Sequence, residues 1–129
     1  MKKQCWAIVW LTIIVSSIGI SLLTAGTPDL TGVWKSSSDG VYYLRQIDNN
    51  LWWYGEAALE HPTWANVACG RIQGDIIELN WSDVPKGEVQ SYGILVVKIE
   101  SANHLVVIKQ TGGFGDSEWS KEEISESEE

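Results

Sequence analysis

Residues 41–57 read VYYLRQI, DNN and LWWYGEA, and this stretch decides the fold class. Two runs that are rich in aromatic and apolar residues flank the short sequence Asp48-Asn49-Asn50. Aromatic and β-branched residues favour strands. Asn and Asp tolerate the backbone conformations of tight turns and hydrogen-bond to their own backbone there. The stretch therefore predicts a β-hairpin.

Short β-rich runs separated by turn residues continue on both sides of this hairpin. After residue 26 no stretch keeps a helical period, whereas turn sequences recur at short intervals. Strands are predicted at 31–36, 41–47, 51–57, 65–73, 76–81, 91–100, 105–110 and 117–120. Because the links have hairpin length, we expect an up-and-down antiparallel meander that closes into a barrel and so removes its edge strands. The predicted fold class is all-β, a small barrel of about eight strands.

The tryptophans are spaced so that some are predicted to face the core and others to face away from it. Alternation along the strands places Trp34, Trp81 and Trp119 in the core. The hairpin differs, because the aromatic pairs at 42–43 and 52–53 put large rings on both faces. Such a hairpin either lies between two layers or exposes one aromatic face, and an exposed face of this kind usually has a purpose.

The N-terminal 26 residues are predicted to be a targeting helix. Lys2 and Lys3 precede an apolar run over residues 5–23, and small residues follow at 24–26. This order is typical of a signal peptide. The run also approaches the length that spans a bilayer, so an uncleaved membrane anchor is the alternative. Either way, the domain at 27–121 is expected to be exported, secreted or tethered to the outer face of the membrane.

The chain is acidic, with a formal net charge of −8, and every Asp and Glu follows residue 26. This charge argues against nucleic-acid binding, which needs a basic surface. Five of the acidic residues lie in the last eight positions, 122–129. Such a run cannot bury apolar surface, so a disordered acidic tail is predicted there.

The sequence contains no convincing catalytic or metal-binding pattern. His61 and His104 are far apart, and the HExxH, CxxC and G-x-S-x-G motifs are missing. No catalytic residue, metal or cofactor is expected. A small hydrolase that uses His61 or a pair of loop carboxylates is one alternative, and an envelope structural domain without a ligand is another. The carboxylates available to such a hydrolase are Glu56, Glu60, Asp83 and Glu88.

The hairpin aromatics are the best lead to a function. Exposed Trp and Arg are the residue types that anchor interfaces. The predicted ligand-binding residues are Tyr43, Arg45, Trp52, Trp53 and Tyr54. In a hollow barrel they would share one wall of a pocket; on the outside they would form a patch for a sugar or a protein. If they are core instead, the loops at 59–64 and 82–89 are the next candidates.

The sequence therefore predicts a non-enzymatic exported binding or interaction module. Its partner would be a small molecule, a glycan or a protein, and the oligomeric state stays open.

Two resemblances accompany this interpretation. Leu30-Thr31-Gly32-Val33-Trp34 resembles the first-strand motif of calycin barrels, the avidin-like and lipocalin proteins. That resemblance implies that Trp34 packs across the closed end of the barrel under a basic residue, Lys121 or Arg45. It carries over no ligand-contacting residue.

The second resemblance covers nearly all of residues 30–120. The stretches YYLRQ, WWYG, NV, DVPKG and TGGFG, followed by Trp119, are similar to those of a widespread set of small microbial exported domains. It implies an exported β-domain and no particular activity.

Overall fold

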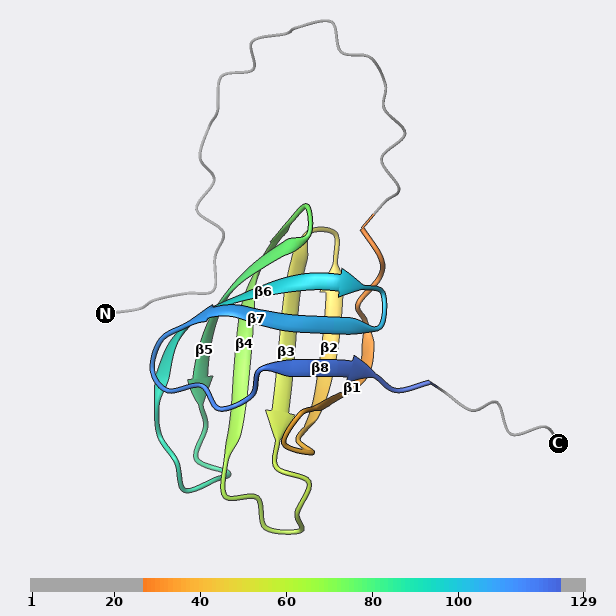
Figure 1. Cartoon of the computed structure of the whole chain (residues 1–129). Helices are drawn as coiled ribbons and strands as arrows, with labels where there is room; N and C mark the ends of the chain where they lie inside the picture. Colours follow the sequence, from red (N-terminus) through yellow and green to blue (C-terminus); the bar gives the residue numbers. More distant parts are fainter. Residues whose placement is uncertain (1–26, 124–129) are drawn as a thin grey trace, which may run out of the picture.

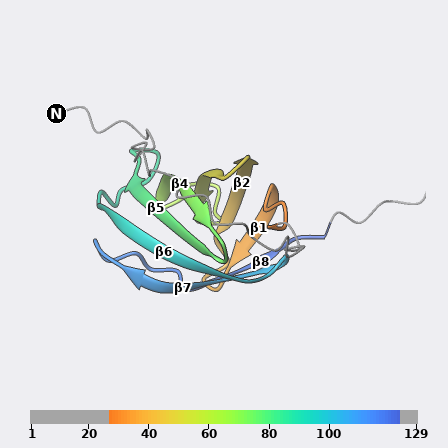
Figure 2. The ribbon, with the colours of Figure 1, turned by 90° about the horizontal axis from the view of Figure 1, so that it is seen from above.

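The structure, a computed structural model, describes residues 27–123, which form a closed barrel of antiparallel strands. The strands are β1 (Gly32–Ser36), β2 (Val41–Ile47), β3 (Asn50–Glu56), β4 (Ala65–Gln73), β5 (Ile76–Asp83), β6 (Tyr92–Ser101), β7 (His104–Gln110) and β8 (Glu118–Lys121). Each strand pairs with the next along the chain, and β1 also pairs with β8 (Figure 1). Figure 2 shows the ring from above, with β1 and β8 side by side. The predicted all-β barrel is confirmed, and each strand begins and ends within two residues of its predicted position.

The interior is filled by the side chains that alternation places there. Trp34, Trp81 and Trp119 are all buried, with no more than 4% of their surface exposed. The apolar residues at every second position of β6 are buried in the same way. Much of the remaining core is aliphatic and contains Leu44, Leu51, Ile72, Ile77, Leu79 and Leu105.

The two ends of the barrel differ in the length of their loops. The β2–β3, β4–β5 and β6–β7 turns contain two residues each and lie at one end. The β1–β2, β3–β4, β5–β6 and β7–β8 loops contain four, eight, eight and seven residues and lie at the other end. In Figure 1 the turns after β2 and β4 are at the top and the loops after β1, β3 and β5 at the bottom. We refer to them as the closed end and the open end.

Leu30 and Trp34 fill the closed end. Leu30 is fully buried, and its carbonyl oxygen accepts a hydrogen bond of 2.9 Å from Trp34 Nε1. The Lys121 ammonium lies 5.9 Å from the centroid of the Trp34 ring and donates to the carbonyl oxygen of Asp29 at 3.1 Å. Of the two basic residues expected over Trp34, it is therefore Lys121 that lies there, while Arg45 is exposed on the outside of β2.

The predicted targeting helix at 1–26 lies outside the described residues, and so does most of the acidic tail. The first tail residue, Glu122, still contacts the barrel: its backbone N–H donates to the Val33 carbonyl at 2.8 Å, and its carboxylate lies 3.3 Å from Lys35 Nζ. Within residues 27–123 no helix is long and apolar enough to cross a membrane.

Candidate functional site

The structure separates the five residues that the sequence singles out for binding. Trp53 points into the barrel and is 4% exposed. Tyr43 and Trp52 face outward, with exposed fractions of 49% and 40%. Arg45 and Tyr54 lie on the same outer face, because each is the cross-strand partner of one of these two residues. The barrel thus gathers four of the five on its outside, and none of the five lines the pocket at the open end.

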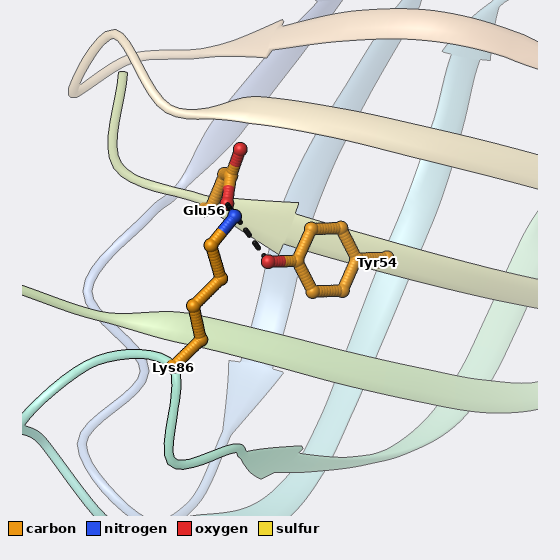
Figure 3. A network of polar contacts seen from close by, with 3 residues as sticks. All are labelled: Tyr54, Glu56 and Lys86. Atoms are coloured by element: carbon orange, nitrogen blue, oxygen red, sulfur yellow. Dashed lines mark hydrogen bonds and ion pairs between the residues drawn. The ribbon is translucent and has the colours of Figure 1, made fainter. Parts of the chain in front are cut away.

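Three polar side chains on this outer face, those of Tyr54, Glu56 and Lys86, contact one another (Figure 3). The Tyr54 hydroxyl donates to Glu56 Oε2 at 2.8 Å, and the Lys86 ammonium pairs with the same oxygen. These two donors, Lys86 foremost, hold the pKa of Glu56 below its usual value. The Tyr54 ring stacks on Tyr43, with 6.5 Å between centroids. Within this network the Lys86 ammonium neutralises the Glu56 carboxylate.

A pocket of about 400 Å³ lies at the open end of the barrel. Its volume falls in the range that holds a small organic molecule. It is formed by residues of β2, β4 and β5 near the open end of the barrel, together with all four open-end loops. Four of its lining residues are aromatic: Tyr42, Trp64, Trp81 and Phe114. Five more are polar or acidic: Ser38, Asn66, Asp83, Ser91 and Asp116.

The aromatic wall exists because alternation and one glycine direct it inward. Tyr42 is the inward neighbour of the exposed Tyr43, and its cross-strand partner on β3 is Gly55. A Cβ atom on Gly55 would lie only 2.3 Å from the Tyr42 ring, so glycine leaves the space that the ring occupies. The ring then packs edge-to-face on Trp53 and Trp119, at centroid distances of 5.4 and 5.6 Å. The wall is therefore continuous with the core and held rigidly.

Asp116 is the buried charge of this pocket. Asp116 is 6% exposed, and its carboxylate accepts two hydrogen bonds. Ser38 Oγ donates to Oδ1, and Tyr42 Oη donates to Oδ2 at 2.5 Å. Burial raises the pKa of Tyr42 far above its usual value, and the Asp116 carboxylate raises it further, against smaller opposing effects of Asn66 and Trp119. Tyr42 therefore stays a hydrogen-bond donor at physiological pH.

Trp119 carries a second unusual polar group beside Tyr42. Its indole Nε1 is buried and has no hydrogen-bond partner in the part of the chain that the structure describes. It lies near enough to Tyr42 to lower the phenol's pKa slightly, but not in hydrogen-bond geometry.

Asp83 is the second carboxyl group in the pocket and stands at the end of β5. Its Oδ2 accepts the backbone N–H of Ser91 at 2.9 Å. Burial raises the pKa of Asp83, and this hydrogen bond opposes the rise in part. Its other oxygen accepts no hydrogen bond within residues 27–123, so Asp83 can take one more donor from a bound molecule.

Hydrogen bonds between the loops fix the rim of the pocket. Ser91 Oγ donates to the Gly112 carbonyl at 2.6 Å and links the β5–β6 loop to the β7–β8 loop. The Glu88 N–H donates to the Thr63 carbonyl at 2.8 Å and links the β5–β6 and β3–β4 loops. The Ser37 N–H donates to the Glu118 carbonyl at 2.9 Å on the other side. A rim tied in this way is formed before any ligand arrives, which lowers the entropic cost of binding.

The carboxylates proposed for a hydrolase do not meet. Asp83 lines the pocket, whereas Glu56 is engaged by Lys86 on the outer face. Glu60, Glu88 and His61 are exposed in the loops and do not line the pocket.

Sequence reasoning missed Asp116 and Tyr42 as pocket residues. The loops at 59–64 and 82–89, named as the second choice, do contribute Trp64 and Asp83. Asp116 was detectable as the one acid that follows a glycine-rich loop directly before the last strand.

The described residues contain no cluster of three or more His, Cys, Asp or Glu side chains that could hold a metal ion. No protein-family model matches the chain, and no curated protein or solved structure is significantly similar to it. Function therefore has to follow from the geometry and chemistry of the site.

Proposed function

We propose that this protein is a non-enzymatic exported binding module that holds a small organic molecule in the pocket at the open end of its barrel. The observation that carries this proposal is the pocket itself, about 400 Å³ with four aromatic walls and converging polar groups on a hydrogen-bonded rim. Apolar walls that enclose a few oriented polar groups are typical of small-molecule sites. Export is proposed from the basic and apolar character of residues 1–26.

We also propose that the barrel is of the calycin type. The packing of Trp34 under Lys121 at the closed end supports this assignment. The assignment concerns the scaffold and does not name a ligand.

The binding proposal is tested by a thermal-shift screen of the full-length chain against a library of small metabolites. A ligand that binds only the folded state raises its stability, by about 2.7 kcal/mol at a hundredfold excess over Kd. Val89→Trp places a bulky side chain on the pocket lining, and Ile94→Trp makes a similar change at an exposed position of β6 that does not line the pocket. Hits should stabilise the native chain and the Ile94→Trp variant but not Val89→Trp. Equal responses from the two variants would remove the pocket as the site.

Surface recognition on the outer face is a second candidate. The stacked Tyr43–Tyr54 pair and the exposed Trp52 favour it. Partners of this face would be a glycan or a protein, and their binding would be lost in Trp52→Ala and retained in Val89→Trp.

Hydrolysis is the candidate from a different class. Asp83, with its raised pKa, and Asp116 line the same pocket, and a pair of carboxyl groups with different environments can act as acid and base. Against it, Asp116 already accepts two hydroxyl donors. Mass spectrometry of each hit after prolonged incubation separates the two functions, because a binding module returns the compound unchanged.

A further inference from the structure

The charge of the pocket is not balanced by the protein. Among the residues that the structure describes, its lining includes two carboxyl groups, Asp83 and Asp116, and no Lys, Arg or His. Neither group forms an ion pair with any residue in the 27–123 range; the ion pairs there involve Glu56, Glu100, Glu118 and Glu122. The outer face, by contrast, pairs its carboxylate with Lys86. The cation that would complement Asp116 is therefore not supplied by the described protein.

Burial of the Asp116 carboxylate without a paired cation costs folding free energy. A buried carboxylate without a cation loses hydration, and hydrogen bonds offset that loss only in part. Asp116 is 6% exposed and uses one lone pair on each oxygen for Ser38 and Tyr42. A carboxylate offers about four acceptor positions, so a donor in the pocket can still reach it. A positively charged donor would recover the most free energy, because charge-assisted hydrogen bonds are the strongest.

The walls fit the same kind of molecule. Tyr42, Trp64, Trp81 and Phe114 present aromatic rings to the pocket. Ring faces attract cations and pack against flat apolar groups. The pocket volume of about 400 Å³ suits one or two rings that carry a charged group.

We propose that the pocket binds a small organic cation, an ammonium, amidinium or guanidinium group on a flat apolar body, with the cation on Asp116 and the body between the aromatic walls. Asp83 contributes a second acceptor at the rim. This inference rests on the proposed small-molecule function and adds the chemical class of the ligand.

The test is isothermal titration calorimetry of the full-length chain with benzamidinium and with benzamide, its neutral counterpart of nearly equal shape. We expect benzamidinium to bind at least about tenfold more tightly, the ratio that one charge-assisted hydrogen bond provides. Asp116→Asn keeps the side-chain shape and should remove most of this preference. Asp75→Asn makes the same chemical change in the exposed β4–β5 turn, away from the pocket, and should leave the preference intact.

Asp83→Asn provides a second variant that does not disturb the Ser38 and Tyr42 hydrogen bonds, and it should weaken benzamidinium binding severalfold. Equal affinity for the two probes would overturn the cation assignment and leave the small-molecule function standing. Equal losses in Asp116→Asn and Asp75→Asn would also overturn it, because general negative charge would then explain the preference. Failure of both probes and of every library compound to bind would remove the proposed function as well.

Discussion

The closed and open ends of this barrel differ in loop length and in how the interior is filled, although the same eight strands run between them. At the closed end the turns have two residues, Leu30 is fully buried, and Trp34 donates its N–H to the Leu30 carbonyl. At the open end the loops are up to four times longer and surround a pocket whose two carboxyl groups form no ion pair with any of residues 27–123. If the open end is the binding site proposed above, stability and recognition are segregated along the barrel axis. Sites commonly lie on loops that a rigid scaffold positions, and they commonly cost stability.

The largest effect is expected from the closed end. Trp34→Ala removes a fully buried ring and leaves a cavity beneath Lys121, which should cost roughly 3–5 kcal/mol. Urea denaturation of the full-length chain measures the change. A loss below about 1 kcal/mol would show that the closed end does not carry the stability assigned to it.

Trp52→Ala tests whether the outer face contributes to stability or to ligand binding. Its ring is 40% exposed, so we expect a loss of less than about 1.5 kcal/mol. Ligands whose binding is lost in Val89→Trp should bind Trp52→Ala with unchanged affinity. If Trp52→Ala abolishes their binding instead, the site lies on the hairpin surface, as the sequence alone suggests.

Two glycines allow a matched comparison of the ends. Gly74 in the β4–β5 turn and Gly113 in the β7–β8 loop have φ values of +62° and +77°, and an added Cβ would meet no atom within 4 Å at either position. Replacement of each by Ala should therefore cost about 1 kcal/mol through backbone strain alone. Only Gly113→Ala should weaken ligand binding, because only Gly113 lines the pocket. Equal effects on binding would mean that the ends are not independent.

Asp83→Asn should give the smallest effect, and with the opposite sign. Because the pKa of Asp83 is raised in the folded chain, the stability that its protonated form contributes is present below the unfolded pKa and is lost as pH rises through the folded pKa. At pH 7 the native carboxylate is thus disfavoured, and Asn should be more stable by about 0.5 kcal/mol.

Thermal denaturation at neutral pH and again well below the normal Asp pKa of about 3.9 measures this difference, which should shrink in acid. Asp75→Asn serves as the control in the exposed turn. A variant that is less stable than the native chain at pH 7 would show that Asp83 supports the fold rather than the site.

The fold was predictable because its signals are local. Two-residue turns such as Asp48-Asn49 and alternation along strands such as β6 determine strand ends and inward faces without long-range information. Alternation could not decide which hairpin aromatics point inward, because each strand carries adjacent rings that face opposite sides. Only the register of the closed barrel shows that Trp53 points inward and Trp52 outward.

The site was less predictable because its residues come from distant parts of the chain. Ser38 and Asp116 are separated by 78 positions and meet only when β8 closes the ring against β1. The glycine-rich loop before Asp116 marks its position in the sequence, but its burial and its contacts with Ser38 and Tyr42 appear only in the closed barrel. The Trp and Arg composition of the hairpin attracted attention instead, yet the pocket lies at the open end, and Glu56 on the hairpin surface is already paired with Lys86.

Binding at the open end is tested most directly by recording the tryptophan indole N–H signals of the full-length chain by NMR during titration with benzamidinium. Trp64 and Trp81 line the open-end pocket, Trp34 fills the closed end, and Trp52 lies on the outer face. We expect saturable shifts of the Trp64 and Trp81 signals, with those of Trp34 and Trp52 unchanged. Shifts of Trp52 alone, or shifts of Trp34 as large as those of Trp81, would contradict the claim that the open end is the binding end.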